Sequence, residues 1–401
     1  MTTSDTATQE TNQDQSQTDS FQTGNVLTIV GGHFIHDTYT AFVAPLLPQL
    51  IDKLSLTLTG AGGLTAFMQF PAILNPFIGY LADKISLRYF VIFAPAVTAT
   101  LIGLLGLAPN YLTLVLLFTL IGISVAAFHA PTPAMIARIA GSKVGRGMSL
   151  YMAGGELGRT LGPLIAVYAV GQWGLEGIYR LVFIGWMSSL VLLWRFRGVS
   201  GSEYRQKAGN LRDEIPKLRT FFLPMLFVPL GRSFLLVSIT TYLPTFLNFE
   251  GASFQLAGIS LAVLEAAGVI GALSSGTISD KLGRKPVVYI TFAASSILLF
   301  TFLQVEGWFG FVILAALGFF SLSPQPVLLA MVQDQLPNNR AAANGLYMLM
   351  AFLVRSLVLV TVGALGDSIG LRDTFLISAG VSLIAIPAMF VLPNPQRQPA
   401  Q

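Results

Sequence analysis

The chain has 401 residues, of which 53% are hydrophobic and only 10% are charged, and its mean hydropathy is +0.69. An ordinary soluble domain has roughly 25% charged residues, so this composition excludes that class and indicates an integral membrane protein. The sequence contains no cysteine, which excludes disulfides, thiolate catalysis and zinc–thiolate sites. The net charge of +4 implies no nucleic-acid partner, because the basic residues fall between apolar runs, as membrane orientation requires.

The chain begins with a polar segment, residues 1–20, that has no basic residue. We expect a disordered tail rather than a signal peptide, because a signal peptide needs a basic n-region. Apolar runs long enough to cross a bilayer follow it. The twelve predicted membrane helices cover residues 25–50, 60–82, 88–107, 111–138, 146–170, 177–196, 219–248, 255–279, 286–304, 308–333, 341–366 and 372–392.

The distribution of Lys and Arg predicts the orientation of these helices. Most of the 23 basic residues fall in the even-numbered connections and the C-terminal tail, and only Lys53, Arg180 and Arg372 fall on the opposite side. The side with more Lys and Arg is cytoplasmic in membrane proteins. We therefore expect a multi-pass protein of a bacterial cytoplasmic (inner) membrane with both termini in the cytoplasm.

A short charged segment occurs twice, at residues 79–88 and 276–285, and each copy joins two predicted helices through a tight cytoplasmic hairpin. At nearly the same offset, Leu150-Tyr151-Met152 repeats as Leu346-Tyr347-Met348 and Arg159 superposes on Arg355. These matches predict a duplicated six-helix unit. The expected parts are a tail at 1–20, an N-terminal half at 21–197, a cytoplasmic linker at 198–218, a C-terminal half at 219–393 and a cytoplasmic tail at 394–401.

The second copy, Gly276-Thr277-Ile278-Ser279-Asp280-Lys281-Leu282-Gly283-Arg284-Lys285, resembles the GxLxDKxGRK signature of the major facilitator superfamily of transporters. The first copy departs from the signature at Ser86 and Leu87. This resemblance implies an all-α membrane fold with two parallel six-helix repeats, alternating access and a substrate near the midplane. The residues that we expect to gate the cytoplasmic side are Gly79, Asp83, Lys84, Arg88, Gly276, Asp280, Lys281 and Arg284.

Ionisable groups inside membrane spans are costly, by roughly 2.5–3.5 kcal/mol on insertion scales, so they are the candidate site residues. The first span holds His33, His36 and Asp37. His33 and Asp37 share a helix face, and a His–Asp pair is suited to taking up and releasing a proton. The alternative is an interior pair that only fixes helix packing. We expect no metal site, because the chain offers few further ligands.

The fifth span reads Gly154-Gly155-Glu156-Leu157-Gly158-Arg159-Thr160-Leu161-Gly162-Pro163, in which glycines at a spacing of four provide a flat strip for helix packing. Glu156 and Arg159 are three residues apart, so they either pair with each other or serve proton coupling and substrate binding. The Gly158-x-x-x-Gly162-Pro163 part also resembles the GxxxGP core of drug/proton antiporters.

Arg232 and Arg355 have no carboxylate near them in their own spans. With Arg159 they are candidates to bind an organic anion, because guanidinium groups bind carboxylate and phosphate bidentately. Glu265 in the eighth span is a candidate for proton coupling, or it neutralises one of these arginines. His129 lies beside prolines and is either a substrate-binding residue or a hydrogen-bonded residue at a kink.

Three stretches together resemble the fosmidomycin-resistance branch of the superfamily. They are His33-x-x-His36-Asp37, Phe128-His129 with Pro131 and Arg138-Ile139-Ala140, and Gly154-Gly155 through Leu161-Gly162-Pro163. That resemblance implies export of small compounds in exchange for protons. Glu156, Arg159 and Arg355 are charged where that branch has small or polar residues, and the added cations favour an anionic substrate.

The function that we expect is proton-coupled secondary transport of a small organic anion, as drug or metabolite efflux. The alternatives are uptake of an organic anion by proton symport or facilitated diffusion, and general drug export. We expect no enzyme activity, no cofactor and no metal, and the predicted partners are the small-molecule substrate, protons and the lipid bilayer. The predicted oligomeric state is a monomer.

Overall fold

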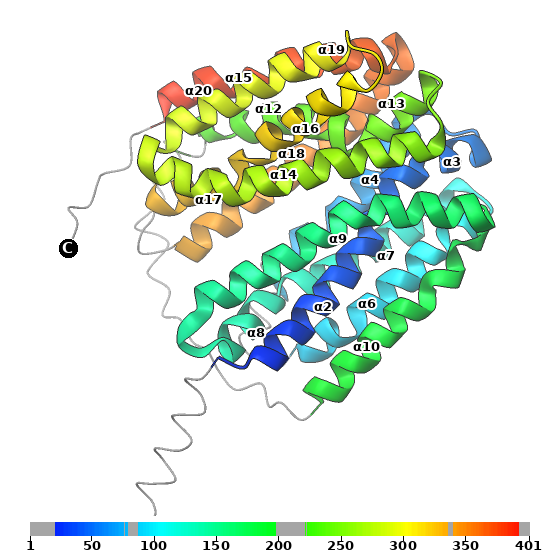
Figure 1. The fold of residues 1–401 in the computed structure, drawn as a ribbon, viewed down its shortest axis with the longest axis vertical. Helices are drawn as coiled ribbons and strands as arrows, with labels where there is room; N and C mark the ends of the chain where they lie inside the picture. Colours follow the sequence, from blue (N-terminus) through cyan, green and yellow to red (C-terminus); the bar gives the residue numbers. More distant parts are fainter. Residues whose placement is uncertain are drawn as a thin grey trace, which may run out of the picture.

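The computed structural model describes residues 21–75, 77–78, 87–197, 221, 223–335 and 340–392, and every regular element in these ranges is a helix (Figure 1). The expected tails and the whole of the expected linker lie outside the described residues. The same holds for Gly79, Asp83 and Lys84 of the first charged segment.

The helices of the first half of the chain follow one another with short connections. They are α2 (Thr23–Thr40), α3 (Val43–Leu54), α4 (Leu58–Gln69), η1 (Phe70–Leu74), α6 (Arg88–Gly103), η2 (Leu105–Leu107), α7 (Tyr111–His129), α8 (Thr132–Ile139), η3 (Gly141–Lys143), α9 (Val144–Trp173), η4 (Glu176–Leu181) and α10 (Val182–Phe196).

The second half has the same character. Its helices are α12 (Phe227–Leu236), η6 (Val237–Tyr242), α13 (Leu243–Phe249), α14 (Phe254–Leu282), α15 (Arg284–Phe302), α16 (Phe309–Leu322), α17 (Pro324–Gln335), α18 (Arg340–Ile369), α19 (Leu371–Ser382) and α20 (Ala385–Val391).

Nine helical segments of the described residues are long and apolar enough to cross a membrane. The remaining predicted spans correspond to α2 with α3, to the shorter apolar segment Leu58–Leu74, and to α9. The helix α9 is 30 residues long, but its glycines and the charged pair Glu156 and Arg159 make it less apolar than the nine. The arrangement is consistent with the twelve predicted spans.

Local sequence signals explain where several helices begin and end. Asn110 and Ser253 each accept a hydrogen bond from the backbone N–H three residues later, which caps α7 and α14. Gly283 ends α14 with a φ of +94°, a conformation that only glycine adopts without strain, and α15 begins at the next residue. The hairpin predicted at the second charged segment is therefore present.

The helices form two groups, one built from the first half of the chain and one from the second (Figure 1). The groups contact each other through α4 with α18, α9 with α14, and α3 with α13. In Figure 1 they lie together at the end where α3, α4 and α13 are found and diverge toward the end where α8 and α17 are found. Since α14 runs from beside α13 to the Gly283 hairpin, the joined end is opposite that hairpin.

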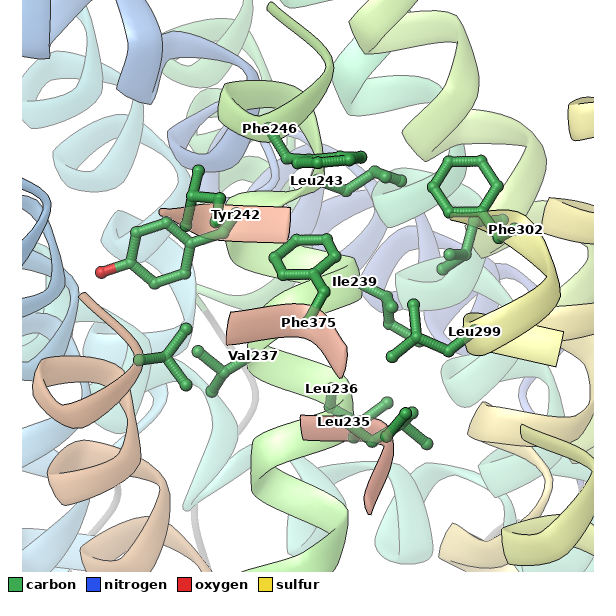
Figure 2. Close-up of a cluster of buried hydrophobic side chains, with 14 of the residues drawn as sticks. Leu235, Leu236, Val237, Ile239, Tyr242, Leu243, Phe246, Leu299, Phe302 and Phe375 are labelled. Carbon is green, nitrogen blue, oxygen red and sulfur yellow. The ribbon is translucent and has the colours of Figure 1, made fainter. Parts of the chain in front are cut away.

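An apolar core crosses the interface at the joined end. It combines residues of both halves, among them Leu47, Leu58 and Ala61 from the first and Tyr242 and Val362 from the second, all of them buried. Figure 2 shows the part contributed by the second half around η6, a π-helical turn inside the seventh span. The Tyr242 ring lies at the edge of this cluster, and its hydroxyl points away from Phe302 (Figure 2).

Polar contacts between the halves surround this core. The Tyr242 hydroxyl lies 3.0 Å from the carbonyl oxygen of Leu58 and 3.2 Å from that of Leu359, and it donates to them. Asp367, at the end of α18, accepts hydrogen bonds from the backbone N–H groups of Leu58 at 2.7 Å and Thr59 at 2.8 Å. The first turn of α4 is thus capped by a carboxylate from the other half of the chain.

Glycines allow the two halves to approach closely. A Cβ added at Gly62 would lie 2.3 Å from the carbonyl oxygen of Leu359, and one at Gly363 would lie 2.3 Å from that of Leu58. No larger residue fits at either position without moving backbone. The interface at this end is therefore a close-packed contact of α4 with α18.

Candidate functional site

Three histidines surround the carboxylate of Asp37, which is only 3% exposed. The Oδ1 atom of Asp37 lies 3.1 Å from His36 Nδ1 and 3.2 Å from His129 Nε2, and the Oδ2 atom lies 3.3 Å from His33 Nε2. His33 and His36 come from α2, whereas His129 is the last residue of α7. The contact expected between His33 and Asp37 is present, and His129 joins it from another helix.

The hydrogen bond on the far side of His33 determines where its proton lies. Its Nδ1 atom is 2.7 Å from the backbone carbonyl oxygen of Tyr151, which can only accept, so Nδ1 carries a hydrogen. In a neutral ring the Nε2 atom then presents a lone pair toward Asp37 Oδ2, and Nε2 has no hydrogen-bond partner among the described residues. A favourable contact between these two atoms requires one added proton, on the imidazole or on the carboxyl. The two atoms can therefore form a hydrogen bond only when a proton lies between them.

His129 connects this buried group to solvent. Its Nδ1 atom lies 3.2 Å from the Tyr151 hydroxyl, and its side chain is 33% exposed, whereas those of His33 and Asp37 are 4% and 5% exposed. His36 is fully buried and its ring stacks on Phe128 with centroids 4.4 Å apart. His129 is therefore the histidine of this cluster that is accessible to solvent.

The ligand atoms of His33, Asp37 and His129 lie within 4.8 Å of one another, so by distance alone they could hold a metal ion. Arg159 argues against that use, because its Nη1 atom lies 3.8 Å from Asp37 Oδ2 and places positive charge beside the carboxylate. The cluster is better suited to protons than to a divalent cation.

Arg159 also forms an ion pair with Glu156, the pair that their spacing predicted as one alternative. Its side chain is 41% exposed, and that of Glu156 is 14% exposed. Two carboxylates thus neutralise Arg159 in the structure. Of the three arginines, it is the one whose charge is already satisfied.

The glycine strip of α9 brings this helix against α2. A Cβ at Gly155 would lie 2.4 Å from His33 Cε1 and 3.0 Å from Asp37 Oδ2, and one at Gly158 would lie 2.5 Å from the carbonyl oxygen of Phe34. Close packing therefore explains these glycines. It also fixes the distance between Tyr151 and His33, because both contacts join the same two helices.

The second half supplies Arg232 from α12, Glu265 from α14 and Arg355 from α18. Among the described residues neither Arg232 nor Arg355 forms an ion pair with a carboxylate. The Nη2 atom of Arg355 donates to the Thr240 hydroxyl at 3.4 Å. Glu265 is 9% exposed and interacts electrostatically with Arg159 and Arg355, but at a longer distance than an ion pair.

The second charged segment is held together by ion pairs. Arg284 contacts Asp280 at 2.5 Å and Asp334 of α17 at 3.4 Å, and it donates to the Ser279 hydroxyl at 2.7 Å. Of the first segment, Arg88 is described, and its guanidinium lies 5.0 Å from the centre of the Tyr89 ring. The second segment therefore ties the α14–α15 hairpin to the end of α17.

Comparison with known proteins decides the family. The model of the Major Facilitator Superfamily matches residues 29–357 and, in a second match, residues 275–401. This chain belongs to the major facilitator superfamily. It is therefore a multi-pass membrane transport protein of a family whose members are not enzymes.

Individual members of the superfamily are similar over nearly the whole chain. The fosmidomycin resistance protein of Escherichia coli (strain K12) is 26% identical, with 90% of this chain and 91% of that protein covered. The multidrug resistance protein MdtG of Citrobacter koseri is also 26% identical, with 88% and 90% covered. A crystal structure of a bacterial homolog to the human lysosomal transporter Spinster matches with a TM-score of 0.77 at 16% identity, covering 92% and 96%, which supports the fold.

These comparisons agree with the resemblance to the fosmidomycin-resistance branch found from the sequence. Several polar residues at the site and at the interface had not been singled out as site residues: Tyr151, Thr240, Tyr242, Tyr347 and Asp367. Tyr151 and Tyr347 carried a signal, because they occupy matching places in the duplicated Leu-Tyr-Met segments. The other three are defined only by contacts between distant parts of the chain.

Proposed function

We propose that this chain is a proton-coupled secondary transporter that exports a small organic anion by alternating access. The observation that carries the proposal is the contrast between the two halves. The first half surrounds Asp37 with three histidines, whereas the second half holds Arg232 and Arg355 without a carboxylate partner among the described residues. One half is equipped for protons and the other for an anion.

The names of the relatives support the direction of transport. Both are resistance proteins, and export of a toxic compound is the simplest activity that gives resistance. The excess of basic residues near the Gly283 hairpin supports a cytoplasmic position for that end of the molecule. With this orientation, the joined end at α3, α4 and α13 faces outward, so the structure corresponds to an inward-facing state in a bacterial cytoplasmic membrane, with both termini in the cytoplasm.

In the proposed cycle, Asp37 and His33 hold the transported proton, and His129 passes it to and from solvent. Arg159 lies beside Asp37 and pairs with Glu156, so protonation of Asp37 leaves Arg159 with one carboxylate fewer. Glu265 lies within electrostatic range of Arg159 and Arg355 and links the two halves. Through these charges the protonation of Asp37 changes the affinity of the arginines for an anion.

The test is transport by purified protein in liposomes with an imposed pH gradient, with fosmidomycin as one probe among small phosphonates, phosphates and carboxylates. We expect Asp37→Asn to abolish accumulation driven by the gradient while substrate exchange between equal concentrations continues. A variant that kept full gradient-driven transport would show that Asp37 does not carry the proton. If the substrate instead moved in the same direction as the protons, the protein would be a symporter and not an exporter.

General drug export is the second candidate, because one relative is named a multidrug resistance protein. Thermal unfolding separates it from anion transport, since a ligand that binds only the folded protein raises the midpoint. Stabilisation by neutral or cationic drugs alone, unchanged in Arg232→Ala and Arg355→Ala, would favour general drug export.

A further inference from the structure

Two buried donors, one on α12 and one on α18, have no hydrogen-bond partner among the described residues. The Nε atom of Arg232 and the hydroxyl of Tyr347 are both inaccessible to solvent, and neither makes a hydrogen bond within the part of the chain that the structure describes. Tyr347 is 1% exposed, and it interacts electrostatically with Arg232 across the contact between these helices. A buried donor without an acceptor is destabilising, so two such groups on two helices in contact indicate a missing acceptor.

In the first half of the chain, the tyrosine at the corresponding position has a hydrogen-bond partner within the protein. Tyr151 occupies the matching position in the duplicated Leu-Tyr-Met segment, and its hydroxyl lies 3.2 Å from His129 Nδ1. The hydroxyl of Tyr151 thus has a partner within the protein, whereas that of Tyr347 has none among the described residues. Packing alone would be served equally well by phenylalanine at position 347.

The chemistry of the missing acceptor follows from the two donors. One is part of a permanent cation and the other is a neutral hydroxyl, and neither Arg232 nor Tyr347 pairs with a carboxylate among the described residues. An oxyanion accepts from both at once, with one oxygen toward Nε–H and another toward O–H. Arg355, eight residues after Tyr347 on α18, adds positive charge within electrostatic range of Arg232.

We propose that Arg232 and Tyr347 together bind the oxyanion of the substrate, and that the Tyr347 hydroxyl determines specificity by donating to it. This inference rests on the proposed function and deepens it, because it names Arg232 and Tyr347 as the residues that bind the anion. Arg159 is not one of them, since Glu156 and Asp37 already neutralise its charge. The ligand is a phosphonate, phosphate or carboxylate group. It is carried either by a small soluble compound or by the headgroup of an anionic lysolipid.

The test is ligand-dependent thermal unfolding of the purified full-length protein. The probes are fosmidomycin, inorganic phosphate, benzoate and lysophosphatidylglycerol, and the variants are Tyr347→Phe and Arg232→Gln. Tyr289→Phe is the matched control, because Tyr289 lies in the same half and its ring stacks on Phe390. Without ligand, Tyr347→Phe should unfold at the same or a higher temperature than the parent, because it removes a hydroxyl that has no partner among the described residues.

We expect Tyr347→Phe to raise the dissociation constant of the stabilising anion about 10- to 100-fold, as for a lost hydrogen bond to a charged group. Arg232→Gln should abolish the response, and Tyr289→Phe should leave it unchanged. If Arg232→Gln lost the response and Tyr347→Phe kept it, anion transport would stand and the role of Tyr347 would be overturned. A lower midpoint of Tyr347→Phe without ligand would also overturn it, by revealing a partner within the protein.

The remaining outcomes identify the source of the oxyanion. Stabilisation by lysophosphatidylglycerol alone, lost in both variants, would support the site and replace the soluble substrate with a lipid headgroup. If no anion stabilised the parent and only neutral or cationic drugs did, the proposed anion transport would fail, and this inference would fail with it.

Discussion

Removing the carboxylate of Asp367 should open the joined end of the molecule. This side chain accepts backbone hydrogen bonds from Leu58 and Thr59 and a third from the Thr59 hydroxyl at 2.5 Å, and all three cross between the halves. Loss of a helix N-cap costs about 0.5–2 kcal/mol, and the exposed position of Asp367 screens its charge. We therefore expect Asp367→Ala to destabilise the closed arrangement of the joined end by about 1–2 kcal/mol. This free energy lowers the ratio of closed to open molecules about 5- to 30-fold.

Labelling of a single cysteine measures this shift, because the chain has no cysteine of its own. Val362 is fully buried in the core that crosses the interface, so Val362→Cys reacts with a membrane-impermeant maleimide only after the outward end opens. We expect Asp367→Ala to raise the labelling rate about 5- to 30-fold in sealed cells.

Asp52→Asn is the control for this experiment, since Asp52 is exposed on α3 at the same end of the molecule. It should label at the parental rate. If Asp367→Ala also labelled at the parental rate, the cap on α4 would not hold the halves together, and the reasoning would be refuted.

Two further substitutions test the site. Gly155→Ala places a methyl group 2.4 Å from His33 Cε1, so we expect a loss of about 1–3 kcal/mol in folding stability and slower proton-driven transport. Gly145→Ala is the control, because an added Cβ there has nothing within 4 Å, and it should change neither stability nor transport. Thermal unfolding measures the stability, and the liposome assay measures the transport. Phe352→Glu places a carboxylate three residues before Arg355, the spacing of Glu156 and Arg159, so anion affinity should fall at least about tenfold in the thermal assay. Phe352→Gln separates charge from size, and equal losses in both variants would contradict neutralisation of Arg355.

The sequence predicted those contacts that lie within one helix. His33 with Asp37 and Glu156 with Arg159 are four and three residues apart, and such pairs meet on a helix face whatever the helix packs against. The hairpin at Gly283 was also predictable, because a glycine between two apolar runs marks a turn. These features depend on local geometry alone.

Contacts between distant helices were not predictable in the same way. Asp367 and Leu58 are 309 residues apart, and His33 and Tyr151 are 118 residues apart, so each pair depends on how the helices pack. The glycines at 62 and 363 show why such packing is hard to infer from one sequence. Each looks like an ordinary small residue in an apolar run until its partner backbone, at 2.3 Å from an added Cβ, is known.

The duplication places different residues at corresponding positions of the two halves. At the offset that superposes Arg159 on Arg355, the position of Glu156 corresponds to Phe352, and that of Asp37 corresponds to Ser233. The second half therefore keeps the arginine and lacks both carboxylates that satisfy it in the first half. At these corresponding positions Arg159 pairs with a carboxylate, whereas Arg355 pairs with none among the described residues, which is the difference that the proposed coupling of protons to an anion requires.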